Sequence, residues 1–135
     1  MSLNEEGRKI LVQLQLEKAE KNFSQIEQLR QLGYWDNIAN RLYYALFHAV
    51  SALLINDGHN ISSHRGAVGT FGQLYVLSGV FSVEEGKHYA RLQTLREKSD
   101  YNCRYEATEE DIAPKIEPTR QLIDKIRRII DCRSK

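Results

Sequence analysis

Three side chains on one helical stripe could bind an anion or move a proton. Arg41 and His48 are seven residues apart, which is nearly two helical turns, and Tyr44 lies between them on the same face. Arginine clamps phosphate or carboxylate groups, and histidine exchanges protons near neutral pH. Because a buried arginine needs a partner or a wet cavity, two interpretations stay open. Arg41 forms a structural salt bridge at the edge of the fold, or Arg41 binds an anion beside His48 as a general acid or base.

A second polar stripe lies later in the chain. Arg96, Asp100 and Arg104 follow one another at i, i+4 and i+8, and Tyr101 is next to them. This spacing is typical of a solvent-exposed charge ladder on a helix. If its helix packs against the helix of Arg41, however, Arg96 and Asp100 converge with Arg41 and His48 on one cleft.

The remaining histidines give weaker signals. His59 and His64 are five residues apart, which is not the i, i+4 spacing of a helical metal pair, so we expect no metal site and no cofactor. His64 and Arg65 stand at the start of a short helical segment, where they could face an anion. His88 is interpreted as a surface residue.

Two long helices must position the first stripe. Apolar residues recur at helical spacing from about residue 4 to residue 32, and Gly33 then supplies a left-handed stop. The next helix is predicted over residues 35–56, with Asp36 as its N-cap and Asp57-Gly58 after its end. This helix is apolar around most of its circumference, which indicates a central position in the fold.

Three further elements follow. A short or irregular helix is predicted after Ser63, since glycines interrupt it. Ser82 and Glu85 form a capping box that opens a helix reaching about Tyr105. The last helix begins near Thr108, and the two prolines at 114 and 118 should kink it or delay its start.

Composition agrees with one small helical domain. The chain has 135 residues, with 8 Gly and only 2 Pro, so we predict an all-α, antiparallel up-and-down bundle of four long helices plus one short helix, spanning residues 4–132 as a single domain. A net charge of +1 excludes a global basic field. No apolar run is expected to approach the roughly 20 residues of a membrane span, and the acidic start argues against a secretory signal. Cys103 and Cys132 are interpreted as reduced thiols, so we expect a cytoplasmic protein without a membrane partner.

Three strings in this order resemble one known family. The segment Arg41-Leu-Tyr-Tyr-Ala-Leu-Phe-His-Ala49 is similar to an R-x-YYA-x-F-x-A pattern, His64-Arg65-Gly66 to an H-R-G pattern, and Leu95-Arg-Glu-Lys-Ser-Asp-Tyr101 to L-R-x-x-x-D-Y. Over about residues 8–131 the chain resembles the HEPN family (higher eukaryotes and prokaryotes nucleotide-binding domains). The resemblance implies a bundle of four long helices with a short extra one, usually as a homodimer.

The resemblance also implies a range of functions. Many HEPN proteins are metal-independent endoribonucleases of toxin–antitoxin, phage-defence or RNA-processing systems, often paired with a small nucleotidyltransferase. Their active pattern is Arg-x(4–6)-His on the later helix. Here Arg96 matches the arginine, whereas Glu97, Tyr101 and Cys103 stand where Asn, His and Tyr are usual. Arg41 and His48 satisfy the loose spacing on the second helix.

The resemblance, together with the convergent arginines, implies a nucleotide- or RNA-binding helical protein that acts with a partner such as a nucleotidyltransferase and holds phosphate in an arginine-lined cleft. The alternatives are a metal-independent endoribonuclease of toxin or defence type and a non-catalytic dimeric interaction protein. The catalytic candidates are Arg41, His48, Arg96 and Asp100. The ligand-binding candidates are Arg41, Tyr44, His48, His64, Arg65, Arg96 and Tyr101.

Overall fold

The computed structural model describes residues 4–59 and 64–133, and helices account for the regular structure in both ranges. No strand occurs within these ranges, which confirms the predicted all-α bundle of four long helices with a short extra one. The elements are α1 (Glu5–Ser24), α2 (Ile26–Leu32), α3 (Trp35–Asn56), α4 (His64–Phe71), a π-helical turn (Gly72–Val76), α5 (Val83–Tyr101), α6 (Glu109–Ile112), a 3-10 turn (Ala113–Lys115) and α7 (Ile116–Arg133).

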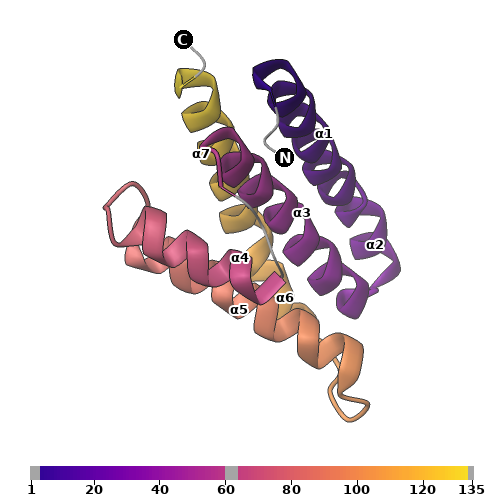
Figure 1. Cartoon of the computed structure of the whole chain (residues 1–135). Coiled ribbons are helices and arrows are strands. Elements are labelled where there is room, and N and C mark those ends of the chain that lie inside the picture. Colours follow the sequence, from indigo (N-terminus) through magenta and orange to yellow (C-terminus); the bar gives the residue numbers. More distant parts are fainter. Residues whose placement is uncertain (1–3, 60–63, 134–135) are drawn as a thin grey trace.

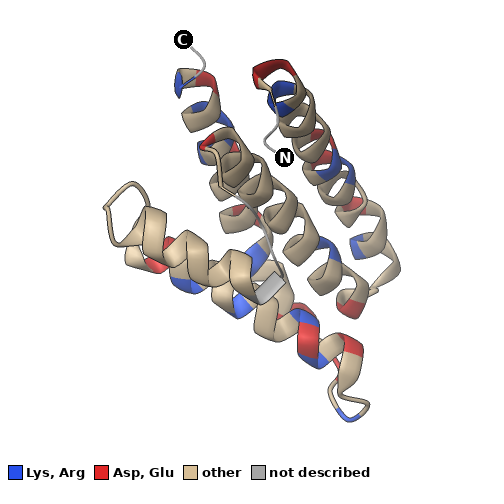
Figure 2. Cartoon of the chain, in the orientation of Figure 1, with Lys and Arg blue, Asp and Glu red and all other residues tan. Residues whose placement is uncertain are grey.

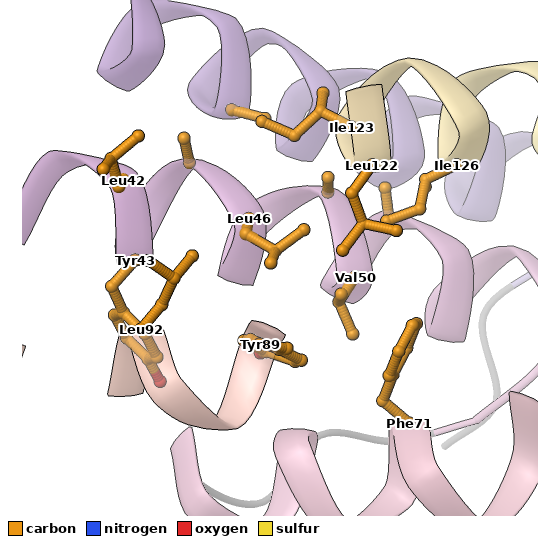
Figure 3. Packing of buried hydrophobic residues seen from close by; sticks show 14 of the residues in the cluster. Leu42, Tyr43, Leu46, Val50, Phe71, Tyr89, Leu92, Leu122, Ile123 and Ile126 are labelled. Carbon is orange, nitrogen blue, oxygen red and sulfur yellow. The ribbon is translucent and has the colours of Figure 1, made fainter. Parts of the chain in front are cut away.

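Helix α3 is the centre of the bundle. It packs against α1, α5 and α7, and α4 also contacts it (Figure 1). Leu42, Leu46 and Val50 of α3 meet Tyr89 and Leu92 from α5 and three side chains from α7 in one apolar core (Figure 3). Asp36 and Arg41 are the only Asp, Glu, Lys or Arg residues in α3. Most of the α3 ribbon is accordingly tan in Figure 2. The few polar residues of α3 are therefore its candidates for a functional role.

Helix α3 is long and apolar enough to resemble a membrane-spanning helix. By length and composition this helix could cross a membrane, because an 18-residue window has a mean hydropathy of 1.3. The expectation that no segment approaches such a length is therefore wrong for α3. Within the bundle 67% of that window is buried, as is typical of a central core helix.

Side-chain caps fix the starts of α1 and α5. Asn4 accepts a hydrogen bond from the Gly7 backbone N–H at 2.7 Å, and the predicted capping box between Ser82 and Glu85 is present. The predicted N-cap role of Asp36 is wrong. Its Oδ1 instead accepts a hydrogen bond from the backbone N–H of Ala107 at 3.1 Å, which ties the start of α3 to the segment after α5.

Four helix boundaries can be compared with the sequence expectation. The first helix breaks at Gln25 into α1 and α2, although no glycine or proline is there. The left-handed stop at Gly33 is confirmed, with φ at 75°. Helix α5 ends at Tyr101, four residues before the predicted end. Pro114 lies in the 3-10 turn that separates α6 from α7, so the last helix is delayed as predicted.

Candidate functional site

Tyr44 lies at the centre of the predicted site. The Arg41 guanidinium is 5.9 Å from the centroid of its ring, and the Arg96 guanidinium from α5 is 5.7 Å from it. The ring of His48 lies one turn further along α3, with its centroid 6.4 Å from that of Tyr44. The structure thus gathers three other sequence-predicted residues, from two helices, around the ring of Tyr44.

Arg96 is nonetheless buried, with only 7% of its surface exposed. Its guanidinium lies 4.9 Å from the ring centroid of Tyr43, and its Nε has no hydrogen-bond partner among the described residues. Burial raises the pKa of Tyr43 to about 12, while the nearby Arg96 charge acts in the opposite direction. Because Tyr43 stays neutral, Arg96 faces aromatic surface and is held there as a cation.

A polar chain connects Arg96 with Arg41 across α5 and α3. Arg96 forms an ion pair with Asp100 at 3.7 Å, and Asn40 Nδ2 donates a hydrogen bond to Asp100 at 3.4 Å. The Oδ1 of Asn40 accepts from Arg41 Nε at 3.0 Å and also from a terminal nitrogen of the same guanidinium. Asn40 therefore fixes the direction of the Arg41 side chain.

The charge of Arg41 is not neutralised by this contact, since an amide oxygen carries no net charge. Within residues 4–59 and 64–133, no carboxylate forms an ion pair with Arg41. The first interpretation of Arg41, a structural salt bridge, is therefore not met by any carboxylate in the described part of the chain. The Arg41 guanidinium is held in one orientation and half-buried, and its positive charge is available to bind an anion.

Arg41 borders two neighbouring hollows. The first, here called the carboxylate hollow, has a volume of about 380 Å³ and lies where the end of α1, α2, the start of α3 and the end of α5 meet. Its polar wall includes the carboxylates of Asp36 and Asp100. It is lined by Gln25, Leu29, Asp36, Asn37, Asn40, Arg41, Ser99 and Asp100.

The second, here called the lysine hollow, has a volume of about 300 Å³ and lies between α1 and α3. It is lined by Lys18, Lys21, Asn22, Gln25, Arg41 and Tyr44. Arg41 and Gln25 belong to both walls, so the two hollows are adjacent. The sequence reasoning missed Lys18 and Lys21, because nothing local to α1 marks them; they become relevant only when α1 packs beside Arg41.

His48 contacts α1 through a hydrogen bond. Its Nδ1 lies 2.7 Å from Oε1 of Gln15 on α1. An amide oxygen only accepts, so Nδ1 carries the proton and donates. His48 is absent from the walls of the two hollows that Arg41 borders. The structure therefore joins His48 to Arg41 through the Tyr44 ring but does not place both at one cavity.

The other predicted site residues are more dispersed. Tyr101 ends α5 with 78% of its surface exposed, and its ring lies 6.0 Å from the Arg96 guanidinium. His64 and Arg65 belong to the first turn of α4, but their side chains lie outside the described part of the structure. Among the described side chains, no cluster of three or more His, Cys, Asp or Glu residues is arranged to hold a metal ion.

The structure contradicts the interpretation of His88 as a surface residue. It is half-buried between α5 and α7, where its Nε2 lies 2.8 Å from Oγ1 of Thr119. The Thr119 hydroxyl donates to the Lys115 carbonyl at 2.7 Å, so its oxygen accepts from His88. Burial lowers the pKa of His88, and the charges of Lys115 and Arg91 add to this effect. His88 is thus a neutral packing residue.

Comparison with known proteins identifies similar chains. The family model described as the HEPN domain matches residues 12–129. The chain is 37% identical over 92 residues to a UPF0332 protein of Thermotoga maritima, which covers 68% of this chain and 70% of that protein. It is 29% identical over 119 residues to "Putative toxin MJ0605" of Methanocaldococcus jannaschii, which covers 88% of each. A UPF0332 protein of Archaeoglobus fulgidus is 30% identical over 105 residues, with 78% and 82% covered.

Proposed function

Because this chain belongs to the HEPN domain family, we propose that it is a nucleotide- or RNA-binding helical protein whose phosphate site is the surface around Arg41. The observation that carries the proposal is the uncompensated charge of Arg41 at the wall of the lysine hollow. A phosphate placed there would meet three cationic side chains from two packed helices.

The chemistry of the lysine hollow suits a phosphate. Arginine offers a rigid fork of donors to phosphate oxygens, and lysine adds a mobile point charge. Lys18 and Lys21 are three residues apart on α1, so they lie on one face of that helix beside Arg41. The half-buried ring of Tyr44 on the same wall could stack against a base, as aromatic side chains do with single-stranded RNA.

The roles of the two arginines differ under this proposal. Arg41 contacts the phosphate, whereas Arg96 is a positioning residue that supports the Tyr44 ring and the Asp100 carboxylate from beneath. The neutral Asn40 amide holds the Arg41 fork in place without cancelling its charge. Orienting the fork in advance reduces the entropy that binding would otherwise cost.

The test is calorimetric titration with a single-stranded hexauridylate at several salt concentrations. We expect Arg41→Ala to weaken binding at least about tenfold, because a charge-assisted hydrogen bond is worth roughly 1.5–3 kcal/mol. The slope of log affinity against log salt should also become shallower by about 0.7 for each phosphate that the variant no longer neutralises. Arg91→Ala removes the same charge from an exposed position between α5 and α7 and serves as the control. Unchanged binding by Arg41→Ala would count against the proposal.

We further propose two partners, which family membership supports. One is a second copy of the chain in a homodimer, which sedimentation equilibrium of the purified protein tests; a concentration-independent monomer mass would reject it. The other is a separately encoded small nucleotidyltransferase. Co-purification from the native host, followed by identification of the bound protein, tests this partner.

A metal-independent ribonuclease is the second candidate, since one relative's name contains the word toxin. In that case His48 would transfer a proton at the 2′-oxygen or the leaving oxygen, and Arg41 would stabilise the phosphorane-like charge. This role requires His48 to turn away from Gln15 toward the lysine hollow. Single-stranded RNA should then be cut equally with and without EDTA by the wild type, and hardly at all by His48→Ala. Intact RNA in both wild-type samples would reject a nuclease.

A further inference from the structure

The two hollows beside Arg41 carry opposite charge. The lysine hollow holds Lys18 and Lys21, whereas the carboxylate hollow holds Asp36 and Asp100. Arg41 stands at the boundary between them. A phosphate is attracted to the first hollow and repelled by the carboxylates of the second. A ligand that occupies both must therefore place hydrogen-bond donors, not a second phosphate, in the carboxylate hollow.

The carboxylate of Asp100 has acceptor capacity left for such donors. Its contacts with Arg96 at 3.7 Å and with Asn40 at 3.4 Å are both longer than a good charge-assisted hydrogen bond. An ionised carboxylate offers about four lone-pair sites. The side chain is also 30% exposed, so a ligand in the hollow can reach it.

A second polar group on the same wall lacks a hydrogen-bond partner among the described residues. The Oγ of Ser99, which precedes Asp100 on α5, is buried and has no hydrogen-bond partner among the described residues. Buried polar atoms without a partner are uncommon and costly in folded proteins. The α5 wall of the carboxylate hollow thus combines an under-used carboxylate with an unpaired hydroxyl.

We infer that the ligand is a ribonucleotide bound across Arg41, with a phosphate in the lysine hollow and the adjoining sugar hydroxyls donating to Asp100 in the carboxylate hollow. This inference rests on the proposed function and extends it, because it assigns a sugar-recognition site and makes the protein selective for RNA over DNA. A 2′-hydroxyl donates a hydrogen bond that deoxyribose lacks, and a carboxylate is a strong acceptor for it.

The test compares two hexanucleotides that share a base and differ only in the sugar, hexauridylate and hexadeoxyuridylate, by fluorescence anisotropy. The wild type should bind the ribose form about tenfold more tightly, since the deoxy form cannot make a hydrogen bond to a charged group. Asp100→Asn should lower this ratio severalfold by weakening the ribose form alone. Lys21→Gln should weaken both forms and leave the ratio unchanged.

Glu84→Gln is the matched control, because it also neutralises one carboxylate on α5 but lies outside both hollows. Equal wild-type affinity for the two forms would overturn the sugar assignment while the phosphate proposal stands. A preference that follows the base, with hexaadenylate and hexauridylate differing and the sugar ratio near one, would overturn it as well. If neither form binds, the phosphate proposal fails and this inference fails with it.

The wild-type comparison needs no variant, so it tests the inference even if Asp100→Asn does not fold. Far-UV circular dichroism of each variant shows whether the helices are intact before its affinities are compared. A folded Asp100→Asn protein that keeps the full wild-type ratio would also overturn the assignment of Asp100.

Discussion

Replacement of Arg96 tests how the site is organised beneath its surface. We expect Arg96→Met to leave the free energy of unfolding within about 1 kcal/mol of the wild type, and Arg96→Ala to lower it by at least about 2 kcal/mol. Methionine keeps most of the volume of the buried side chain, whereas alanine leaves a cavity against Tyr43 and Tyr44.

The expected change in the free energy of unfolding follows from two stabilising contributions of Arg96 and one destabilising contribution. The guanidinium lies 4.9 Å from the Tyr43 centroid, and a desolvated cation–π contact at that range stabilises by about 2 kcal/mol. The long ion pair with the part-exposed Asp100 adds no more than about 1 kcal/mol. Against these, the buried and unpaired Nε costs roughly 1–3 kcal/mol, which methionine removes.

Urea denaturation followed by circular dichroism at 222 nm measures the effect, because the described secondary structure is helical and its loss dominates that signal. Arg104→Ala, an exposed arginine just beyond the end of α5, is the control and should stay within about 0.5 kcal/mol of the wild type. If Arg96→Met is as destabilised as Arg96→Ala, the favourable guanidinium contacts outweigh the cost of the unpaired Nε, and the prediction is wrong.

Two further predictions concern stability. Gly33→Ala should lower the free energy of unfolding by roughly 1–2 kcal/mol, since the backbone φ is 75° there. Gly69→Ala in α4 should raise the free energy of unfolding by about 0.5–1 kcal/mol, because the added Cβ meets nothing within 4 Å. Equal shifts of the urea midpoint in the two variants would contradict this pair. The hydrogen bond from Arg120 lowers the pKa of Glu20 below its ordinary 4.5, so its contribution is full above pH 4.5 and is lost as the pH falls through the lower, folded-state value. Glu20→Gln should therefore flatten the loss of stability on acidification below pH 4.5, and an unchanged acid titration of the unfolding free energy would count against that contribution.

Local sequence patterns were sufficient for the helix that carries the site. The apolar run of α3 and the glycine stops on either side of it predicted its bounds, Trp35–Asn56, as the structure has them. The capping box at Ser82 could also be predicted from the sequence, because its two partners are three residues apart. These features depend on neighbours in the chain and so need no knowledge of the packing.

Features that depend on distant partners were not accessible in this way. Asp36 has the residue type of an N-cap, but it binds the Ala107 N–H, 71 residues away. Arg96 has the spacing of an exposed ladder, yet it is buried because Tyr43 and Tyr44 of α3 cover its guanidinium. The resemblance drew attention to the strings that contain Arg41 and Arg96, but it did not indicate that lysines of α1 lie beside Arg41.

An amide chemical-shift titration of ¹⁵N-labelled protein with hexauridylate locates the bound phosphate on the protein. We expect the largest shifts on α1 around Lys18 and Lys21 and on α3 around Asn40 and Arg41, on the walls of the two hollows. Shifts confined to the surface around Arg91 between α5 and α7, or no shifts at saturating RNA, would contradict it.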